Sequence, residues 1–440
     1  MAELRVESRP FTEVRRPRVL IVAAKWWPLS ARLASAFVKH GCAVSALCPA
    51  GHPIAKVSGL ERVIRFTGMD SLFSLRNALM TARPDFIVPC DDGVVAQLHS
   101  LHSSEPSCRT VIENSLGSPA GFPIVCSRER LLEAAAQLGI TVAQTRRVLG
   151  PEDLVHWHRQ APMSVVKVDG ESGGNGVRIC GSIEEALAAW RDLTKPLGLM
   201  TGWKRLYIDR DPIALWRWGN RAVPEITVQQ LIRGRPANCM AASRDGKLIS
   251  IVSVAVLAAD GPTGAAVIIQ RIRNAPMEKA AVLLAEKLKI TGFFGLDFMI
   301  AADTKVPYLI EMNPRSTQLG HLEFADQGSL VGAFSAHWCG KPAPRAENAI
   351  RARSIALFPQ ALKAAASRHH DSSYLDLPWD EPALEAELKL HPWPERQWAA
   401  RLYHALRPMD RSAAVEYDKP DDSNAMATRV APRRADAAVR

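Results

Sequence analysis

The stretch VVKVDGESGGNGVRI, residues 165–179, joins a short apolar strand to a glycine-rich loop. The strand reads as buried, yet it carries one lysine, Lys167. Glycines at positions 170, 173, 174 and 176 would let backbone N–H groups converge on phosphate oxygens without obstruction by Cβ atoms. A lysine on the strand before such a loop would place a positive charge on the same phosphates. A glycine hairpin beside a lysine that reaches solvent explains this stretch alone equally well.

A second group of residues lies more than a hundred positions downstream. The stretches GLDFMI (295–300) and YLIEMN (308–313) flank a short polar turn. If they pair as a hairpin centred on Thr304, Asp297 lies directly opposite Glu311, with Cβ atoms about 5 Å apart. Two carboxylates at that separation repel each other unless a cation joins them.

The residues after Glu311 extend this acidic face. Asn313 and Arg315 follow at period two on the same face, whereas Ile310 and Met312 are expected to point the other way. Two carboxylates and an amide oxygen form a hard-oxygen site suited to Mg²⁺ or Mn²⁺ that shares its other positions with phosphate. The alternative is a surface ion cluster in which Arg315 neutralises the acidic pair.

Strand and helix signals alternate along the first hundred residues, at 18–24, 30–41, 42–49, 71–84 and 85–92. This order predicts βαβ units and a parallel sheet. The last run ends in Asp91 and Asp92, one of which is expected to cap the next helix. No G-x-G-x-x-G follows the first strand, which argues against a dinucleotide site.

The middle of the chain changes character several times. The segments read as a capped helix at 126–140, a helix at 182–193, a Trp- and Arg-rich insertion or lid at 201–222, an antiparallel sheet at 226–269 and a long helix at 275–292. Past residue 341 the composition shifts to proline, alanine and charge, which indicates a small accessory region and a disordered end.

The charge, the cysteines and the apolar stretches of the chain indicate which classes of protein are expected. The net charge of +10 is spread along the chain without aromatic interleaving, so a solvated surface is preferred to a nucleic-acid interface. The eight cysteines form no C-x-x-C pair, which indicates free thiols in a reducing compartment. No apolar stretch is long enough for a membrane span and no secretory signal is visible, so the cytoplasm is expected.

Taken together, these segments resemble the ATP-grasp superfamily of carboxylate–amine and carboxylate–thiol ligases over roughly residues 18–340. The stretch 228–238, VQQLIRGRPAN, is similar to the family's hinge strand, whose backbone receives adenine. The resemblance implies a mixed α/β and α+β fold. Its expected parts are a flexible N-terminus (1–17), a Rossmann-like front domain (18–115), a two-lobed ATP-grasp domain (116–340), an accessory region (341–410) and a disordered tail (411–440).

The resemblance also implies roles for individual residues. Lys167 would contact the α and β phosphates, and Arg315 would stabilise the transferred phosphoryl group. Arg128 stands where the family often has lysine, and Gln230 where it often has glutamate. The implied ATP-binding residues are Arg128, Lys167, Gly173, Gly174, Gly176, Gln229, Gln230 and Leu231, and the implied Mg²⁺ or Mn²⁺ ligands are Asp297, Glu311 and Asn313.

The implied reaction transfers phosphate from ATP to a small carboxylate, and an amine or thiol then attacks the acyl phosphate, with ADP and phosphate released. Arg271, Arg273 and His321 could bind these substrates, although a structural role for His321 is the more frequent outcome. Two alternatives stay open: a biotin-type carboxylase, despite the lack of a Met-Lys-Met segment, and a non-catalytic ATP-binding protein. A homodimer is the assembly considered.

Overall fold

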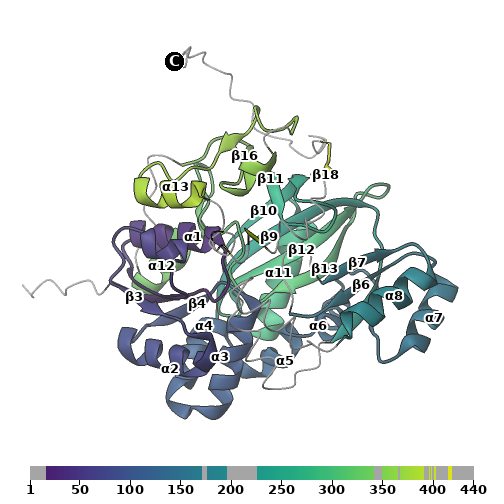
Figure 1. The fold of residues 1–440 in the computed structure, drawn as a ribbon, viewed down its shortest axis with the longest axis horizontal. Coiled ribbons are helices and arrows are strands. Elements are labelled where there is room, and N and C mark those ends of the chain that lie inside the picture. Colours follow the sequence, from purple (N-terminus) through teal and green to yellow (C-terminus); the bar gives the residue numbers. More distant parts are fainter. Residues whose placement is uncertain are drawn as a thin grey trace, which may run out of the picture.

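The computed structural model describes residues 16–170, 176–195, 225–340, 349–364, 367–390 and 415–418, with residues 396, 398, 401 and 402. Three main sheets organise these residues, as Figure 1 shows. Gly173, Gly174 and the Trp- and Arg-rich insertion at 201–222 lie outside the described residues. Within them, no helix combines the length and the apolar character that a bilayer crossing requires.

The front of the molecule is a parallel four-stranded sheet in the order β3-β2-β1-β4, as the alternating signals predicted. Its elements are β1 (Arg18–Val22), α1 (Pro28–Lys39), β2 (Ala43–Cys48), β3 (Arg62–Arg65), α2 (Ser71–Ala82), β4 (Phe86–Pro89) and α3 (Asp92–Ser104). Strand β3 is not among the predicted elements. It is an edge strand with mostly exposed side chains, so its sequence RVIR carries no buried pattern.

A second, small sheet contains β6 (Ser164–Val168), the strand that carries Lys167, which we call the lysine strand. It is antiparallel in the order β5-β8-β6-β7, and its other strands are β5 (Thr145–Arg147), β7 (Val177–Cys180) and β8 (Ile226–Gln230). Helices α7 (Pro151–Gln160) and α8 (Ile183–Leu193) pack on its outer face in Figure 1. Helix α6 (Arg128–Gln137) lies within the capped helix predicted at 126–140, and its cap is Ser127, whose side chain accepts from the Arg130 N–H.

The third sheet is the largest. It holds the hairpin that carries Asp297 and Glu311, which we call the acidic hairpin. Its strands run in the order β13-β12-β9-β10-β11-β16-β17, with β18 paired to β10. They are β9 (Gly234–Arg244), β10 (Lys247–Ala259), β11 (Ala266–Ile272), β12 (Gly292–Ala301), β13 (Pro307–Asn313), β16 (Ser354–Ala356), β17 (Tyr374–Leu375) and β18 (Val415–Glu416).

This large sheet is buried on both faces. Helix α11 (Ala275–Leu288) packs with Cys239 and Ala241 on one face, and helix α12 (Leu330–Cys339) packs with Met240 and Ala242 on the other. Strand β9 therefore alternates between two cores, as a covered strand should. The antiparallel pairing predicted for residues 226–269 is observed from β9 to β11, whereas residues 226–230 form β8 of the small sheet and not part of this one.

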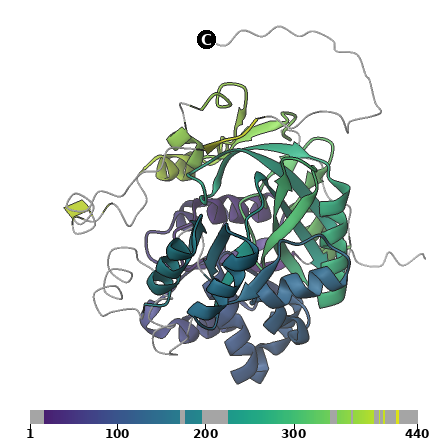
Figure 2. The same cartoon turned by 90° about the vertical axis from the view of Figure 1, so that its right-hand side faces the viewer.

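The C-terminal region extends the large sheet. Strands β16 and β17, from the region expected as an accessory domain, add to its edge, and helix α13 (Pro382–Lys389) packs against the front domain. Strand β18 lies within the segment expected as a disordered tail. Figure 2 shows these yellow-green segments along one end of the sheet. Strands of two or three residues leave no periodicity for sequence analysis to detect.

A buried ion cluster ties this C-terminal region to the front domain. Asp376 accepts from Arg32 of α1 (Nη2 to Oδ1, 2.7 Å) and contacts His321 (Nε2 to Oδ2, 2.5 Å). All three side chains are nearly inaccessible to solvent. Burial raises the pKa of the Asp376 carboxyl. The combined effect of Arg32 and His321 lowers this pKa by more than burial raises it, so the net pKa lies below the ordinary value.

An Asp376→Ala variant is expected to reduce the free energy of unfolding by about 3–5 kcal/mol, because Arg32 would stay buried without its carboxylate. Since the folded pKa is depressed, this stabilisation is present above the ordinary aspartate pKa and is lost as pH falls through the folded value. Urea titrations at several pH values would measure it. The control is Asp380→Ala, which removes an exposed partner of Lys39 and should cost about 0–1 kcal/mol.

Candidate functional site

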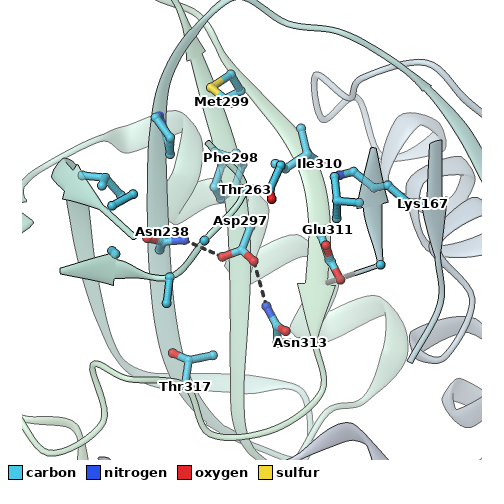
Figure 3. A pocket seen from close by; sticks show the side chains of 18 of the residues that line it. Lys167, Asn238, Thr263, Asp297, Phe298, Met299, Ile310, Glu311, Asn313 and Thr317 are labelled. Carbon is cyan, nitrogen blue, oxygen red and sulfur yellow. Dashed lines mark hydrogen bonds between the residues drawn. The ribbon is translucent and has the colours of Figure 1, made fainter. Parts of the chain in front are cut away.

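A cavity of about 510 Å³ lies where the three sheets meet. Figure 3 shows part of its lining, which β9, β12 and β13 contribute from one side and the lysine strand from another. It brings together most of the predicted site residues: Arg128, Lys167, Gly176, Gln229, Gln230, Leu231, Asp297, Glu311, Asn313 and Arg315. The structure therefore gathers residues from segments nearly two hundred positions apart.

The acidic hairpin has the predicted pairing at its centre. Asp297 of β12 lies opposite Glu311 of β13. The register then shifts, because Phe298 pairs with Leu309 and leaves Ile310 as an extra residue in β13. Ile310 lines the cavity as a result, and the prediction that it points away is wrong.

Asp297 is held in place by two amides. Its Oδ1 accepts from Asn238 Nδ2 (2.6 Å) and its Oδ2 accepts from Asn313 Nδ2 (2.9 Å), as Figure 3 shows. Burial raises the pKa of the Asp297 carboxyl, and the charge of Glu311 raises it further, while both amides act in the opposite direction. Sequence analysis missed Asn238, which faces Asp297 from β9, since the pairing of β9 with β12 spans more than fifty residues.

Arg128 lies at the start of α6 and connects two carboxylates. Its Nη2 lies 2.9 Å from Glu311 Oε1, and its Nη1 contacts Asp169 Oδ1. Asp169, at the end of the lysine strand, also accepts from the Arg128 backbone N–H (3.1 Å). Arg128 is therefore positioned to carry charge at the predicted place, but in this structure its partners are acidic side chains. Asp169 is a second residue that sequence analysis missed.

Lys167 lies in the middle of β6 and is only 5% exposed. Burial first and the charge of Arg128 second lower the pKa of its ammonium to about 8, against the opposite effect of Glu311 and Asp297. Figure 3 shows the side chain extending toward β13 beside Glu311. A cation that is costly to bury therefore faces the cavity, which is the placement expected of a residue that binds an anionic ligand.

The hinge between the small and large sheets is joined to the hairpin bulge. The Gln229 side chain is 1% exposed, and its Nε2 donates to the Ile310 carbonyl (3.1 Å) and to Thr145 Oγ1 (2.8 Å). Gln229, Gln230 and Leu231 all line the cavity, so the predicted hinge segment reaches it.

Arg315 links the hairpin to the front domain. Its Nε donates to Asp92 Oδ1 (2.9 Å), and its Nη2 donates to Asn313 Oδ1 (3.0 Å). Asp91, the neighbour of Asp92, caps α3 by accepting from Val94 N–H (2.9 Å), which confirms the predicted cap. The carboxyl end of the parallel sheet therefore abuts the acidic site, as open α/β sheets lead one to expect.

Three predicted substrate residues lie elsewhere. Arg271 pairs with Asp326 (Nη2 to Oδ2, 2.6 Å), Arg273 is exposed, and His321 belongs to the buried cluster with Asp376. None of the three is among the described residues that line the cavity. Their role in binding substrate stays a prediction, and the geometry offers no support for it.

The donor set suits a hard divalent cation. Asp297 and Glu311 supply carboxylate oxygens and Asn313 an amide oxygen, which are the ligand types that Mg²⁺ and Mn²⁺ prefer. The set has two carboxylates and one amide, and nowhere among the described residues do three or more His, Cys, Asp or Glu side chains gather in a way that could hold a metal ion. Arg128 contacts Glu311 Oε1 and Arg315 contacts Asn313 Oδ1, so a bound cation would share these oxygens with the arginines or displace them.

Comparisons with known proteins agree with this arrangement. A family model described as an ATP-grasp domain matches residues 213–318. A comparison with curated proteins gave no match. Among solved structures, carboxyaminoimidazole ribonucleotide synthase from Aspergillus clavatus, complexed with ATP, has a TM-score of 0.53 at 16% identity. The match covers 76% of this chain and 80% of that one.

Two further structures share the fold. The biotin carboxylase domain of the Hydrogenobacter thermophilus 2-oxoglutarate carboxylase has a TM-score of 0.53 at 11% identity, covering 76% of this chain and 72% of that one. L-amino acid ligase from Bacillus licheniformis has a TM-score of 0.50 at 14% identity, covering 73% and 74%. The predicted fold class is thereby confirmed: residues 213–318 match the model of an ATP-grasp domain, and the chain shares the fold of these solved structures.

Proposed function

We propose that the protein is an ATP-dependent ligase that joins a small carboxylate to an amine, or to a thiol, through an acyl phosphate. One observation carries this proposal: Lys167 and the pair of Asp297 and Glu311 face one cavity from opposite lobes. A cation on one wall and a cation-binding acid pair on the other match the needs of a bound triphosphate.

In the proposed reaction a substrate carboxylate oxygen attacks the γ-phosphorus, and the bond to the leaving ADP oxygen breaks. The amine nitrogen then attacks the acyl carbon, the carbon–oxygen bond to phosphate breaks, and the nitrogen loses a proton. Lys167 and Arg315 would balance the charge on the phosphoryl oxygens. A divalent cation held by Asp297, Glu311 and Asn313 would neutralise the same oxygens.

The adenine would lie against the hinge. Gln230 ends β8 and Leu231 follows it, and backbone groups at this edge of the cavity can pair with the edge of a purine. Met299 and Ile179 offer apolar contact surface in the same cavity.

The proposal is tested with the purified full chain, ATP, Mg²⁺ and a panel of carboxylates in the presence of hydroxylamine, which traps acyl phosphates as hydroxamates. Carboxylate-dependent ADP and hydroxamate are expected together. ADP formation that depends on bicarbonate alone would favour the biotin-type carboxylase, which likeness to a biotin carboxylase domain also suggests. ATP binding without any ADP formation would favour the non-catalytic alternative.

Asn238 is expected to act as a positioning residue for Asp297. An Asn238→Ala variant loses the 2.6 Å hydrogen bond to Asp297 Oδ1, so the half-saturating Mg²⁺ concentration should rise by roughly 10- to 100-fold. The KM for ATP at saturating Mg²⁺ should change far less. The measurement is ADP formation across a Mg²⁺ titration. Equal changes in both constants would show that Asn238 only supports folding.

A further inference from the structure

The front domain supplies a wall of the cavity that the nucleotide site does not explain. Lys25, Trp26 and Trp27, between β1 and α1, line it together with Leu319. The turn after β10 adds Pro262, and β18 leads into Tyr417. This wall is largely aromatic and aliphatic, unlike the charged wall around Asp297.

The backbone of the loop that carries the two tryptophans is held in place by hydrogen bonds to buried side chains. Asp91 Oδ2 accepts from the backbone N–H groups of Ala24 (2.7 Å) and Lys25 (3.4 Å), and Asp91 itself is 6% exposed. His52 Nε2 lies 3.1 Å from the Lys25 carbonyl oxygen. A wall held in this way before a ligand arrives loses little conformational entropy on binding.

The same wall contains polar atoms that lack partners. Trp26 Nε1 and Gln318 Oε1 are buried and have no hydrogen-bond partner within the described part of the chain. A buried donor or acceptor left unpaired costs about 1–3 kcal/mol, so a ligand that pairs with both would recover that cost. One donor and one acceptor match the carboxylate oxygen and the amino group of an amino acid.

The charge of the wall indicates which ligands it can hold. Helix α1 begins after Trp27 without a side-chain cap, so its positive end favours a carboxylate nearby. The described cations of the cavity are Lys25, Arg128, Lys167 and Arg315, and the last three surround the acid pair. The front-domain wall thus carries one lysine, which is little charge for a phosphate monoester with three acceptor oxygens.

From these observations we infer that Trp26 and Trp27 determine the specificity of the ligase for an unphosphorylated amino acid with a flat, apolar side chain. Trp26 Nε1 donates to the ligand carboxylate, Gln318 accepts from its amino group, and the Trp27 ring covers its side chain. This inference rests on the proposed function, because it describes the substrate of the same cavity.

The test is calorimetric titration of the full chain, saturated with Mg²⁺ and a non-hydrolysable ATP analogue, with L-phenylalanine, L-alanine and ribose 5-phosphate. L-phenylalanine is expected to bind about tenfold more tightly than L-alanine, and ribose 5-phosphate more weakly than either. In Trp27→Leu, which keeps an apolar side chain but removes the flat ring, the preference for L-phenylalanine should fall below about threefold.

Two matched variants complete the test. Trp26→Phe keeps a ring but removes the N–H group, and it should weaken both amino acids by about tenfold. Trp379→Phe changes an exposed tryptophan outside the described lining and should change neither affinity. Tighter binding of ribose 5-phosphate, an unchanged preference in Trp27→Leu, or no binding of either amino acid up to about 10 mM would overturn the inference. Amino-acid binding without hydroxamate formation would instead contradict the ligase activity alone.

Discussion

A Lys167→Met variant is expected to bind ATP about 10- to 100-fold more weakly than the wild-type protein, and to be more stable than it when no ligand is bound. The loss of affinity follows from removing a charged donor to phosphate oxygens. The gain in stability follows from removing a buried ammonium, whose pKa burial and Arg128 lower to about 8. A side chain that stabilises only the liganded protein is one whose placement serves binding.

The size and pH dependence of the gain follow from the pKa. A shift from 10.5 to about 8 corresponds to about 3 kcal/mol of destabilisation at neutral pH. Between these two pKa values the unfolded chain binds more protons than the folded chain, so wild-type stability rises as pH increases through this window. Urea titrations of both proteins at pH 7 and pH 10 should show the stability difference shrinking at the higher pH.

Lys247→Met is the matched control, since it makes the same change at an exposed lysine at the start of β10. It should alter neither ATP affinity nor the pH dependence of unfolding. If Lys167→Met bound ATP as tightly as the wild-type protein does, Lys167 would have no part in binding ATP.

A Glu311→Gln variant is expected to reduce ATP-dependent phosphate release on the order of 10²- to 10³-fold, because the cation that balances the γ-phosphate would lose a charged ligand. The change keeps the shape of the side chain. It removes one of the two carboxylates that contact Arg128, so a lower thermal midpoint is also expected. The readouts are phosphate release under saturating ATP and Mg²⁺, and thermal unfolding without ligand.

Asp303→Asn provides the comparison within the same hairpin, because Asp303 is exposed in the turn and outside the described lining of the cavity. It should retain the wild-type rate and thermal midpoint. If Glu311→Gln released phosphate at the wild-type rate while folded, the acid pair would have no part in turnover.

Much of the site could be predicted because its signals are local. The apolar run around Lys167, the glycines after it and the acidic alternation of β13 are each read within about ten residues. The pairing of Asp297 with Glu311 was predictable because a short turn joins their strands.

The rest depends on contacts between distant segments. Asn238 meets Asp297 through the pairing of β9 with β12, and Asp169 meets Arg128 through the packing of two lobes. Strand β3 and the strands after residue 349 are too short or too exposed to show a buried pattern. A bulge such as that at Ile310 adds one residue without any distinctive residue type, so the alternation pattern alone could not reveal it.

Because of the bulge at Ile310, the length of the hairpin can change without moving Asp297 and Glu311 out of alignment. Asp297 is anchored by its pairing with Asn238 on β9, and Glu311 by its pairing with Asp297. The extra residue lies between that pair and the turn, where a change of strand length can be absorbed. Residues added to or deleted from the loop at 302–306 should therefore leave both carboxylates aligned, which makes this loop a suitable point for grafting a peptide or a probe without loss of turnover.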